Sequence, residues 1–177
     1  FLQTIQYCLS LTMQRNENET MLFEMSQIDR LTSFYNRNRF IQDVSELKEC
    51  KESVGVVYLD INGLKEINDS FGHDTGDKMI KECADIVKNS VDSKYLYRIG
   101  GDEFLVLIPG ITENLFQSMI RSIQADMAEG SVHLALGSVW VDCTDNAEKT
   151  LSEADARMYE DKRAYYAKNR QLDRRRR

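Results

Sequence analysis

Two neighbouring acidic residues follow a pair of glycines in the middle of the chain. The segment 100–104 reads Gly-Gly-Asp-Glu-Phe and lies between two short apolar runs, residues 95–99 and 104–108. Apolar runs joined by Gly-Gly are typical of a β-hairpin, because glycine accepts a positive φ and lets a ligand approach the backbone closely. Asp102 and Glu103 are therefore predicted at the hairpin tip, where they either bind a positive group or are simply solvated.

A third acid, Asp60, follows a β-branched run at residues 54–59 that has the composition of a buried strand. Open α/β sheets usually place their ligand contacts at the carboxyl ends of strands. Asp60 and the acids at 102–103 are thus predicted to converge on one hard cation. Mg²⁺ suits this set, because it takes oxygen ligands and is often completed by substrate phosphates. The alternative for Asp60 is a helix N-cap.

Helices and strands alternate around these acids. Apolar residues at helical spacing predict helices over 36–48, 63–71, 77–89, 113–127 and 147–168. Strands are predicted over 54–59, 95–99, 104–108 and 132–141. This order predicts an α/β sandwich that contains antiparallel strands.

The N-terminal segment, residues 1–28, carries apolar residues at helical spacing and is predicted to be a helical linker. Its apolar stripe either packs on the domain or continues a dimerising coiled coil from upstream. The domain itself is expected over 29–170, with a basic tail at 171–177. Because the chain begins at Phe1 rather than methionine, we expect a fragment of a longer protein with an upstream sensory domain.

The composition limits the class of protein. A chain of 177 residues with 42% hydrophobic residues can form one compact domain plus an appendage. The net charge of -6 argues against nucleic-acid binding. No stretch reaches the ~18 apolar residues of a membrane span. The cysteines show no CxxC pair and are interpreted as reduced thiols of a cytoplasmic domain, with a membrane anchor possible elsewhere in the full-length protein. They are Cys8, Cys50, Cys83 and Cys143.

An ordered set of motifs resembles the GGDEF domain of diguanylate cyclases. The motifs are Asp-Arg-Leu-Thr at 29–32, Leu-Asp-Ile-Asn-Gly-Leu-Lys-Glu-Ile-Asn-Asp at 59–69, Phe-Gly-His at 71–73, Gly-Asp at 76–77, Arg-Ile-Gly-Gly-Asp-Glu-Phe at 98–104, Leu-Gly at 136–137 and Ala-Asp-Ala-Arg-Met-Tyr at 154–159. The resemblance implies a ferredoxin-like, mostly antiparallel palm sheet flanked by helices, as in nucleotidyl cyclases. It also implies condensation of two GTP molecules into cyclic di-GMP with release of pyrophosphate.

The resemblance assigns roles to the acidic residues. Asp60, the Ile61 carbonyl, Asp102 and Glu103 would hold Mg²⁺, with Mn²⁺ as a possible substitute. Asp102 is also the candidate proton acceptor for the attacking ribose 3'-hydroxyl. Lys65 would stabilise transition-state charge, although a lysine on a helix is otherwise an ordinary solvated residue.

The triphosphate would be bound by main-chain amides at the start of a helix and by a lysine of the last helix. The amides are those of Asn62, Gly63 and Leu64, and Gly101 and Lys162 are the further substrate positions. The arginine that the family often carries four positions after Lys162 is absent, and Tyr166 stands there. Triphosphate affinity is therefore expected to be weaker, or to use Lys168 instead.

Guanine would be recognised by Asn68 and Asp77, because a carboxylate accepts both hydrogens of the guanine edge and an amide offers both polarities. Asp77 favours GTP over a mixture of GTP and ATP, since adenine presents an acceptor at N1. The alternatives are a helix C-cap for Asn68 and a helix N-cap for Asp77. His73 matches a substrate-site position but is equally explained as a turn residue.

Each domain would hold one GTP, so catalysis requires a homodimer of facing domains. The inhibitory product site of many family members, Arg-x-x-Asp, is replaced here by Val-Asp-Ser-Lys at 91–94. We therefore expect no product inhibition through that site. The alternatives to a cyclase are a catalytically silent module that binds GTP or a cyclic dinucleotide to regulate a partner, and a nucleotidyl cyclase of other specificity.

Overall fold

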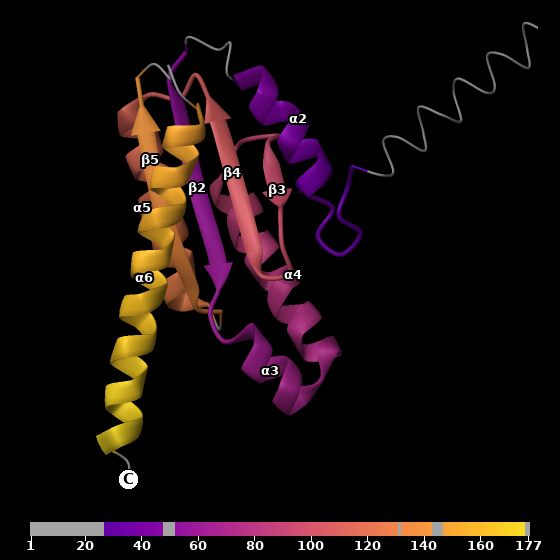
Figure 1. Cartoon of the computed structure of the whole chain (residues 1–177), viewed down its shortest axis with the longest axis vertical. Helices are drawn as coiled ribbons and strands as arrows, with labels where there is room; N and C mark the ends of the chain where they lie inside the picture. The colour runs from indigo at the N-terminus through magenta and orange to yellow at the C-terminus, as the bar shows by residue number, and fades with distance from the viewer. Residues whose placement is uncertain (1–26, 48–51, 131, 143–146, 176–177) are drawn as a thin grey trace, which may run out of the picture.

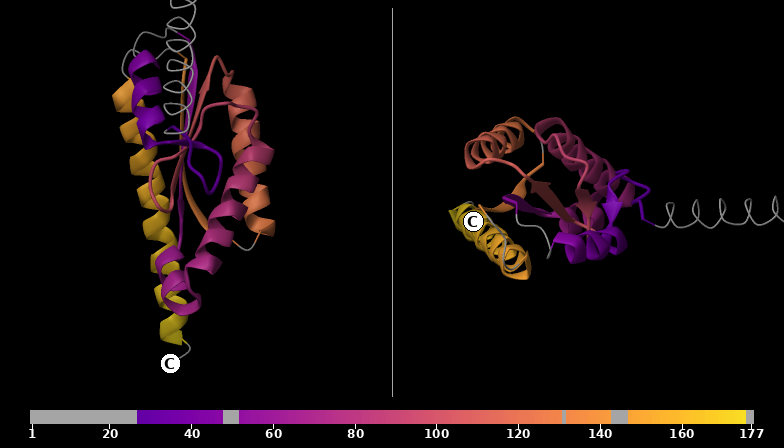
Figure 2. Two further views of the ribbon diagram at one scale, coloured as in Figure 1. Left: turned by 90° about the vertical axis from the view of Figure 1, so that its right-hand side faces the viewer. Right: turned by 90° about the horizontal axis from the view of Figure 1, so that it is seen from above.

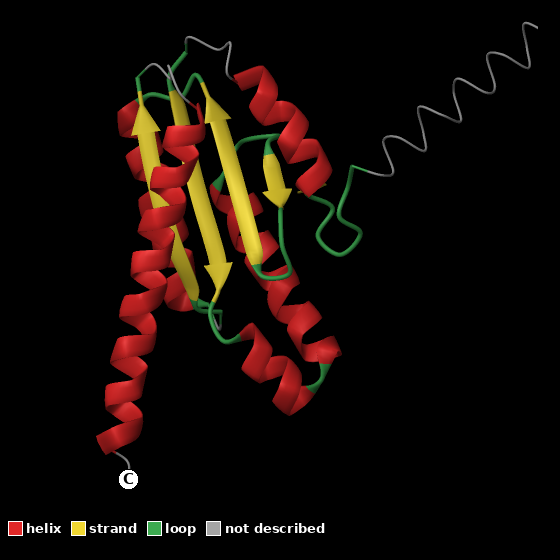
Figure 3. Cartoon of the chain, viewed as in Figure 1, coloured by secondary structure: helices red, strands yellow, loops and turns green. Residues whose placement is uncertain are grey.

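The computed structural model describes residues 27–47, 52–130, 132–142 and 147–175. Most of the predicted helical linker, Cys8, Cys50, Cys143 and the end of the basic tail lie outside the described residues. Within these ranges the strands form one sheet in the order β1-β3-β4-β2-β5 (Figures 1 and 3). Their bounds are β1 (Tyr35–Asn36), β2 (Val54–Ile61), β3 (Leu96–Arg98), β4 (Glu103–Pro109) and β5 (Leu134–Val141). Only β1 and β3 pair in parallel, so the predicted, mostly antiparallel sheet is confirmed.

Helices cover both faces of the sheet. Their bounds are α2 (Arg37–Leu47), α3 (Leu64–Phe71), α4 (His73–Ser90), α5 (Glu113–Glu129) and α6 (Ala147–Arg175). Figure 2 shows α4 and α5 on one face and α2 and α6 on the other. The α/β sandwich predicted from the order of the elements is therefore confirmed.

The central strands are apolar on both sides, because each face of the sheet packs against helices. In β4, Phe104 and Val106 belong to the core beneath α4 and α5, whereas Leu105 and Leu107 belong to the core beneath α2 and α6. This alternation follows from the two-residue period of a strand. A strand buried on both faces reads as a continuous apolar run, which explains the composition of β2.

Helix α6 packs closely on β5 and β2 and continues beyond the end of the sheet (Figure 1). A Cβ atom at Gly137 would collide with the backbone carbonyl of Ala154 in α6. Glycine therefore permits the close approach of helix and strand at this point. The consequence is that the second half of α6 lies beside the end of β2, where Asp60 is located.

Three details differ from the sequence predictions. The two-residue strand β1 was not predicted, and α4 begins at His73 rather than at residue 77. Positive φ angles occur at other described glycines, not at Gly100 or Gly101, so left-handed backbone is not the reason for this glycine pair. Instead, a Cβ at Gly100 would lie 2.7 Å from a carboxylate oxygen of Glu103. A larger residue at position 100 would therefore displace the Glu103 side chain from its present position.

Candidate functional site

The sheet brings the three predicted acids together. Asp60 lies opposite Glu103 in the β2–β4 register, and the Ile61 N–H donates to the Asp102 carbonyl at 3.0 Å. Asp60 is only 3% exposed, because it lies inside β2 beneath flanking elements. The alternative interpretation of Asp60 as a helix N-cap is wrong, since it is a strand residue and the N-cap of α3 is Gly63.

The acids repel one another electrostatically. Burial raises the pKa of Asp60, and the charge of Asp102 raises it further, while Lys162 opposes both effects. Burial also raises the pKa of Glu103, with additional repulsion from Asp102, Asp60 and Asp155. A bound cation would relieve this repulsion and favour the ionised carboxylates.

The donor set fits a hard cation that needs few protein ligands. In the described part of the chain, no three His, Cys, Asp or Glu side chains are grouped as a ready-made metal site. Mg²⁺ is usually held by one or two carboxylates, with waters and substrate phosphates as the remaining ligands. The Asp60 and Asp102 carboxylates and the Ile61 carbonyl are compatible with that mode of binding.

Lys162 of α6 pairs with Asp60 instead of facing solvent. Its ammonium nitrogen lies 2.6 Å from Asp60 Oδ1. Burial lowers the pKa of Lys162, but the bond to Asp60 and the Asp60 and Asp102 charges outweigh burial and raise it. Lys162, predicted from the sequence as a phosphate contact, therefore lies at the acid cluster and neutralises part of its charge.

The turn between β2 and α3 is held by the protein itself. The Asn62 N–H donates to the His133 carbonyl at 2.8 Å, and the Gly63 N–H donates to the Tyr166 hydroxyl oxygen at 3.1 Å. Gly63 has a φ of 78°, in the left-handed region that favours glycine. Two of the three amides predicted to bind phosphate thus already have acceptors. Leu64 begins α3 and is buried.

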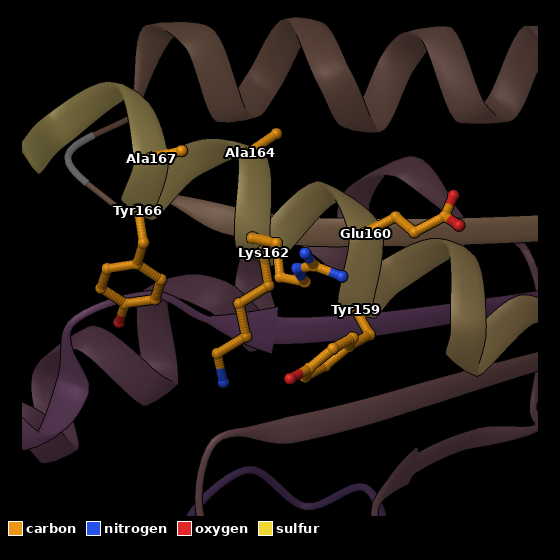
Figure 4. A pocket seen from close by; sticks show the side chains of 7 residues that line it. Tyr159, Glu160, Lys162, Ala164, Tyr166 and Ala167 are labelled. Atoms are coloured by element: carbon orange, nitrogen blue, oxygen red, sulfur yellow. The ribbon is translucent and has the colours of Figure 1, made fainter. Parts of the chain in front are cut away.

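A pocket of about 680 Å³ lies alongside this half of α6. Its lining residues are Tyr159, Glu160, Lys162, Arg163, Ala164, Tyr166 and Ala167. Figure 4 shows that Lys162 and Tyr166 point from α6 toward the end of β2 and the turn that follows it. The pocket therefore adjoins the acid cluster rather than a separate part of the molecule.

The predicted guanine contacts Asn68 and Asp77 lie on α3 and α4, two helices that pack against each other. A Cβ at Gly76 would collide with the Asn68 side-chain oxygen, so Asn68 lies directly against the residue that precedes Asp77. The alternative interpretation of Asn68 as a helix C-cap is wrong, because the C-cap of α3 is Gly72. The N-cap role of Asp77 is also wrong, because Asp77 lies within α4. Asp77 is exposed and available to a ligand.

The remaining predicted residues are accessible. Lys65 lies in the first turn of α3 and His73 is the first residue of α4, and both are exposed. Among the described residues, no atom lies within 4 Å of the position that a Cβ at Gly101 would take. A ligand could therefore approach the backbone of the hairpin tip at Gly101.

Sequence reasoning gave no role to Arg98, the residue two before the glycine pair. Its Nη2 atom donates to the Gly101 carbonyl at 2.8 Å, and its Nη1 atom contacts both carboxylate oxygens of Asp29. The signal was present, since Arg98 and Asp29 both belong to the recognised motifs. Their pairing joins segments almost seventy residues apart, which no local pattern reveals.

Comparisons with known proteins identify the family. The family model described as diguanylate cyclase, GGDEF domain, matches residues 26–168. Diguanylate cyclase DgcS of Shewanella oneidensis is 32% identical over 165 residues, which is 86% of this chain and 56% of the relative. Diguanylate cyclase VdcA of Vibrio cholerae is 31% identical over 147 residues, which is 76% of this chain and 43% of the relative. The chain thus spans about half the length of these two relatives.

A solved structure shares the fold. The coiled coil and GGDEF domain of DgcB from Caulobacter crescentus, crystallised in complex with c-di-GMP, superimposes with a TM-score of 0.80. Its sequence is 20% identical, and the alignment covers 90% of this chain and 93% of that one. None of the described helices is long and apolar enough to cross a bilayer. Because the family model matches most of its length, the chain belongs to the GGDEF domain family of diguanylate cyclases.

Proposed function

We propose that this domain condenses two GTP molecules into cyclic di-GMP with release of pyrophosphate, and that it does so as a homodimer. The observation that carries the proposal is the position of Asp60, which is buried opposite Glu103 and beside Asp102. A buried carboxylate that two neighbouring acids repel is unfavourable in a free domain. It is useful in a site that binds a cation together with an anionic substrate.

Asp60, the Ile61 carbonyl, Asp102 and Glu103 would hold Mg²⁺, or Mn²⁺ in its place. The bound ion supplies charge neutralisation for the triphosphate and lowers the pKa of a coordinated hydroxyl. Asp102 lies at the hairpin tip, where its carboxylate can accept the proton of the ribose 3'-hydroxyl. In this arrangement the buried Asp60 fixes the position of the site, and the less buried Asp102 meets the reacting group.

The cationic side chains would orient the triphosphate. Lys65 is exposed in the first turn of α3, so its ammonium can contact phosphate oxygens without leaving its helix. Lys162 would exchange its contact with Asp60 for one with phosphate once the carboxylate has another cationic partner. Both lysines would stabilise the charge that develops on the leaving pyrophosphate.

Guanine would bind at the junction of α3 and α4. The Asn68 side chain lies against Gly76, the residue before Asp77, and His73 begins the same helix. A carboxylate at Asp77 accepts hydrogen bonds from the guanine N1–H and exocyclic amine, whereas it repels the N1 acceptor of adenine. We therefore propose GTP as the substrate rather than ATP or a mixture of the two.

The test uses the full chain fused at its N-terminus to a dimerising coiled coil. With GTP and Mg²⁺ the fusion should produce cyclic di-GMP, and Asp102→Asn should lower the rate by at least about a hundredfold. Asp92→Asn is the matched control, because that carboxylate is exposed in the loop between α4 and β3. Equal rates for wild type and Asp102→Asn would contradict the proposed role of the acid cluster.

A catalytically silent nucleotide-binding module is the second candidate. One observation favours it, because the Tyr166 hydroxyl oxygen already accepts the Gly63 N–H that a phosphate oxygen would otherwise accept. GTP binding by calorimetry without turnover in the dimeric fusion would support this candidate. Incubation with ATP alone, and with an equimolar mixture of ATP and GTP, separates a cyclase of other specificity. In the full-length protein we propose a cytoplasmic position for this domain, downstream of a sensory domain.

A further inference from the structure

Helix α6 places two side chains against the end of β2 and the turn after it. Lys162 pairs with Asp60, and one helical turn later the Tyr166 hydroxyl oxygen accepts the Gly63 N–H at 3.1 Å. The two partners in this second contact are 103 residues apart in the sequence. The turn is therefore tied to α6 by a neutral hydrogen bond as well as by an ion pair.

Aromatic contacts hold Tyr166 in this position. The rings of Tyr165 and Tyr166 meet edge to face, with centroids 5.4 Å apart, and Tyr165 lies 5.5 Å from the His133 ring. The His133 carbonyl in turn accepts the Asn62 N–H. A continuous series of contacts thus runs from Asn62 through His133, Tyr165 and Tyr166 back to Gly63. These contacts hold Tyr166 at the turn.

The same turn contains a polar group that the protein leaves unsatisfied. The side-chain oxygen of Asn62 is buried and has no hydrogen-bond partner among the described residues, and Asn62 is only 3% exposed. Buried polar atoms without partners are rare, and a ligand, a water or an ion usually completes them. The turn thus combines an amide that is already occupied with a buried oxygen that still lacks a donor.

We infer that Tyr166 is an internal competitor for the nucleotide's phosphates, an inference that rests on the proposed function. An amide N–H donates well to only one acceptor, so a phosphate oxygen reaches Gly63 only after the tyrosine hydroxyl has left it. Triphosphate affinity is therefore set partly by the hydrogen bond between Tyr166 and Gly63. Tyr166 is an affinity-determining residue, and it takes no part in the bond-forming step.

The test measures binding of 3'-deoxy-GTP with Mg²⁺ by calorimetry, because this analogue lacks the attacking hydroxyl and cannot react. Tyr166→Phe keeps the ring and its contact with Tyr165 but removes the competing acceptor. It should tighten binding by about two- to tenfold, the range that one neutral hydrogen bond supplies. Binding of guanosine, which carries no phosphate, should be the same in both proteins.

Tyr95→Phe is the matched control, because it also removes one tyrosine hydroxyl. Tyr95 directly precedes β3, and in the sheet β4 and β2 separate β3 from β5, the strand on which α6 packs. It should leave the affinity for 3'-deoxy-GTP unchanged. A nuclear magnetic resonance spectrum without nucleotide adds a separate readout, since Tyr166→Phe should shift the Gly63 amide resonance and Tyr95→Phe should not.

Weaker or unchanged binding of 3'-deoxy-GTP by Tyr166→Phe would overturn the inference and leave the proposed function intact. An unmoved Gly63 resonance would overturn it as well. Absence of binding by both wild type and Tyr166→Phe would contradict the inference and the proposed function together. Binding by the variant alone would support the inference in its strongest form.

Discussion

Arg98 and Asp29 form an ion pair, in which one arginine nitrogen contacts both carboxylate oxygens, and this pair connects the hairpin tip to the loop that precedes β1. The Arg98 Nη1 atom lies 3.2 Å and 3.1 Å from the two carboxylate oxygens of Asp29, and Nη2 donates to the Gly101 carbonyl at 2.8 Å. Asp29 also accepts hydrogen bonds from the Thr32 amide and hydroxyl. The Arg98 guanidinium therefore connects the hairpin that carries Asp102 to the loop that contains Asp29.

The ion pair predicts a dependence of stability on pH. Burial raises the pKa of Asp29, but the hydrogen bonds from Thr32 and the Arg98 charge outweigh burial and lower it below 3.8. A carboxyl whose folded pKa is depressed stabilises the fold above its unfolded pKa, and this contribution disappears as the pH falls through the folded value. Asp29→Asn should therefore lower the free energy of unfolding by about 1–2 kcal/mol at pH 7.

The difference between Asp29→Asn and wild type should shrink toward zero below about pH 4. Urea unfolding at a series of pH values from 3 to 7 measures it. Asp85→Asn, at an exposed acid of α4, is the control and should follow the wild-type curve. A difference that stays constant across this pH range would show that Asp29 does not act through its charge.

Local patterns predicted the parts of the fold that are built from local contacts. The apolar run of β2 and those that flank the glycine pair are long enough to predict strands, and the structure contains these strands close to the predicted bounds. The two-residue strand β1 has no period to detect. The start of α4 was placed too late because Gly76 normally interrupts helices, whereas here it lies inside α4 and makes room for Asn68.

The site was predictable only where motifs carried it. Asp60, Asp102 and Glu103 were brought together by the strand order, as expected from their positions at strand ends. The contact between Tyr166 and Gly63 and the pair of Arg98 and Asp29 depend on how α6 and the N-terminal loop pack on the sheet. Such pairings are set by tertiary packing, and the sequence near each residue contains no sign of its partner.

The approach of α6 to β5 predicts a contrast between two glycines. Gly137→Ala places a Cβ against the backbone of Ala154 and Met158, and a backbone cannot rotate away as a side chain can. Overpacking of this kind should lower the free energy of unfolding by about 1–3 kcal/mol. Gly101→Ala meets no described atom within 4 Å and should change stability by less than about 0.5 kcal/mol. Urea unfolding of both variants makes the comparison, and equal stabilities would contradict the close packing of α6.

The buried position of Asp60 predicts how the domain responds to Mg²⁺ in the absence of nucleotide. Burial and the Asp102 charge raise the pKa of Asp60, so its ionised form is less favourable in the fold than in solvent, although Lys162 offsets part of this cost. A cation that binds there should stabilise the domain and raise the melting temperature of the wild type. Asp60→Asn should abolish most of this rise, as measured by thermal unfolding with and without millimolar Mg²⁺.

Asp85→Asn serves again as the control for Mg²⁺, because it removes one exposed negative charge without touching the acid cluster. Its melting temperature should rise with Mg²⁺ as much as that of the wild type. A rise of the same size in Asp60→Asn would mean that the ion binds elsewhere on the acidic surface.

The loop between α4 and β3 predicts that the product does not inhibit through this segment. Val91 stands where an inhibitory site would carry arginine, and it is 5% exposed and part of the core beneath α4 and α5. Lys94 replaces the acidic partner and lies over the Tyr95 ring. Adding cyclic di-GMP to the dimeric fusion at the start of the reaction should leave the initial rate unchanged. A rate that falls with added product in the wild type, and equally in Lys94→Ala, would place an inhibitory site elsewhere on the domain.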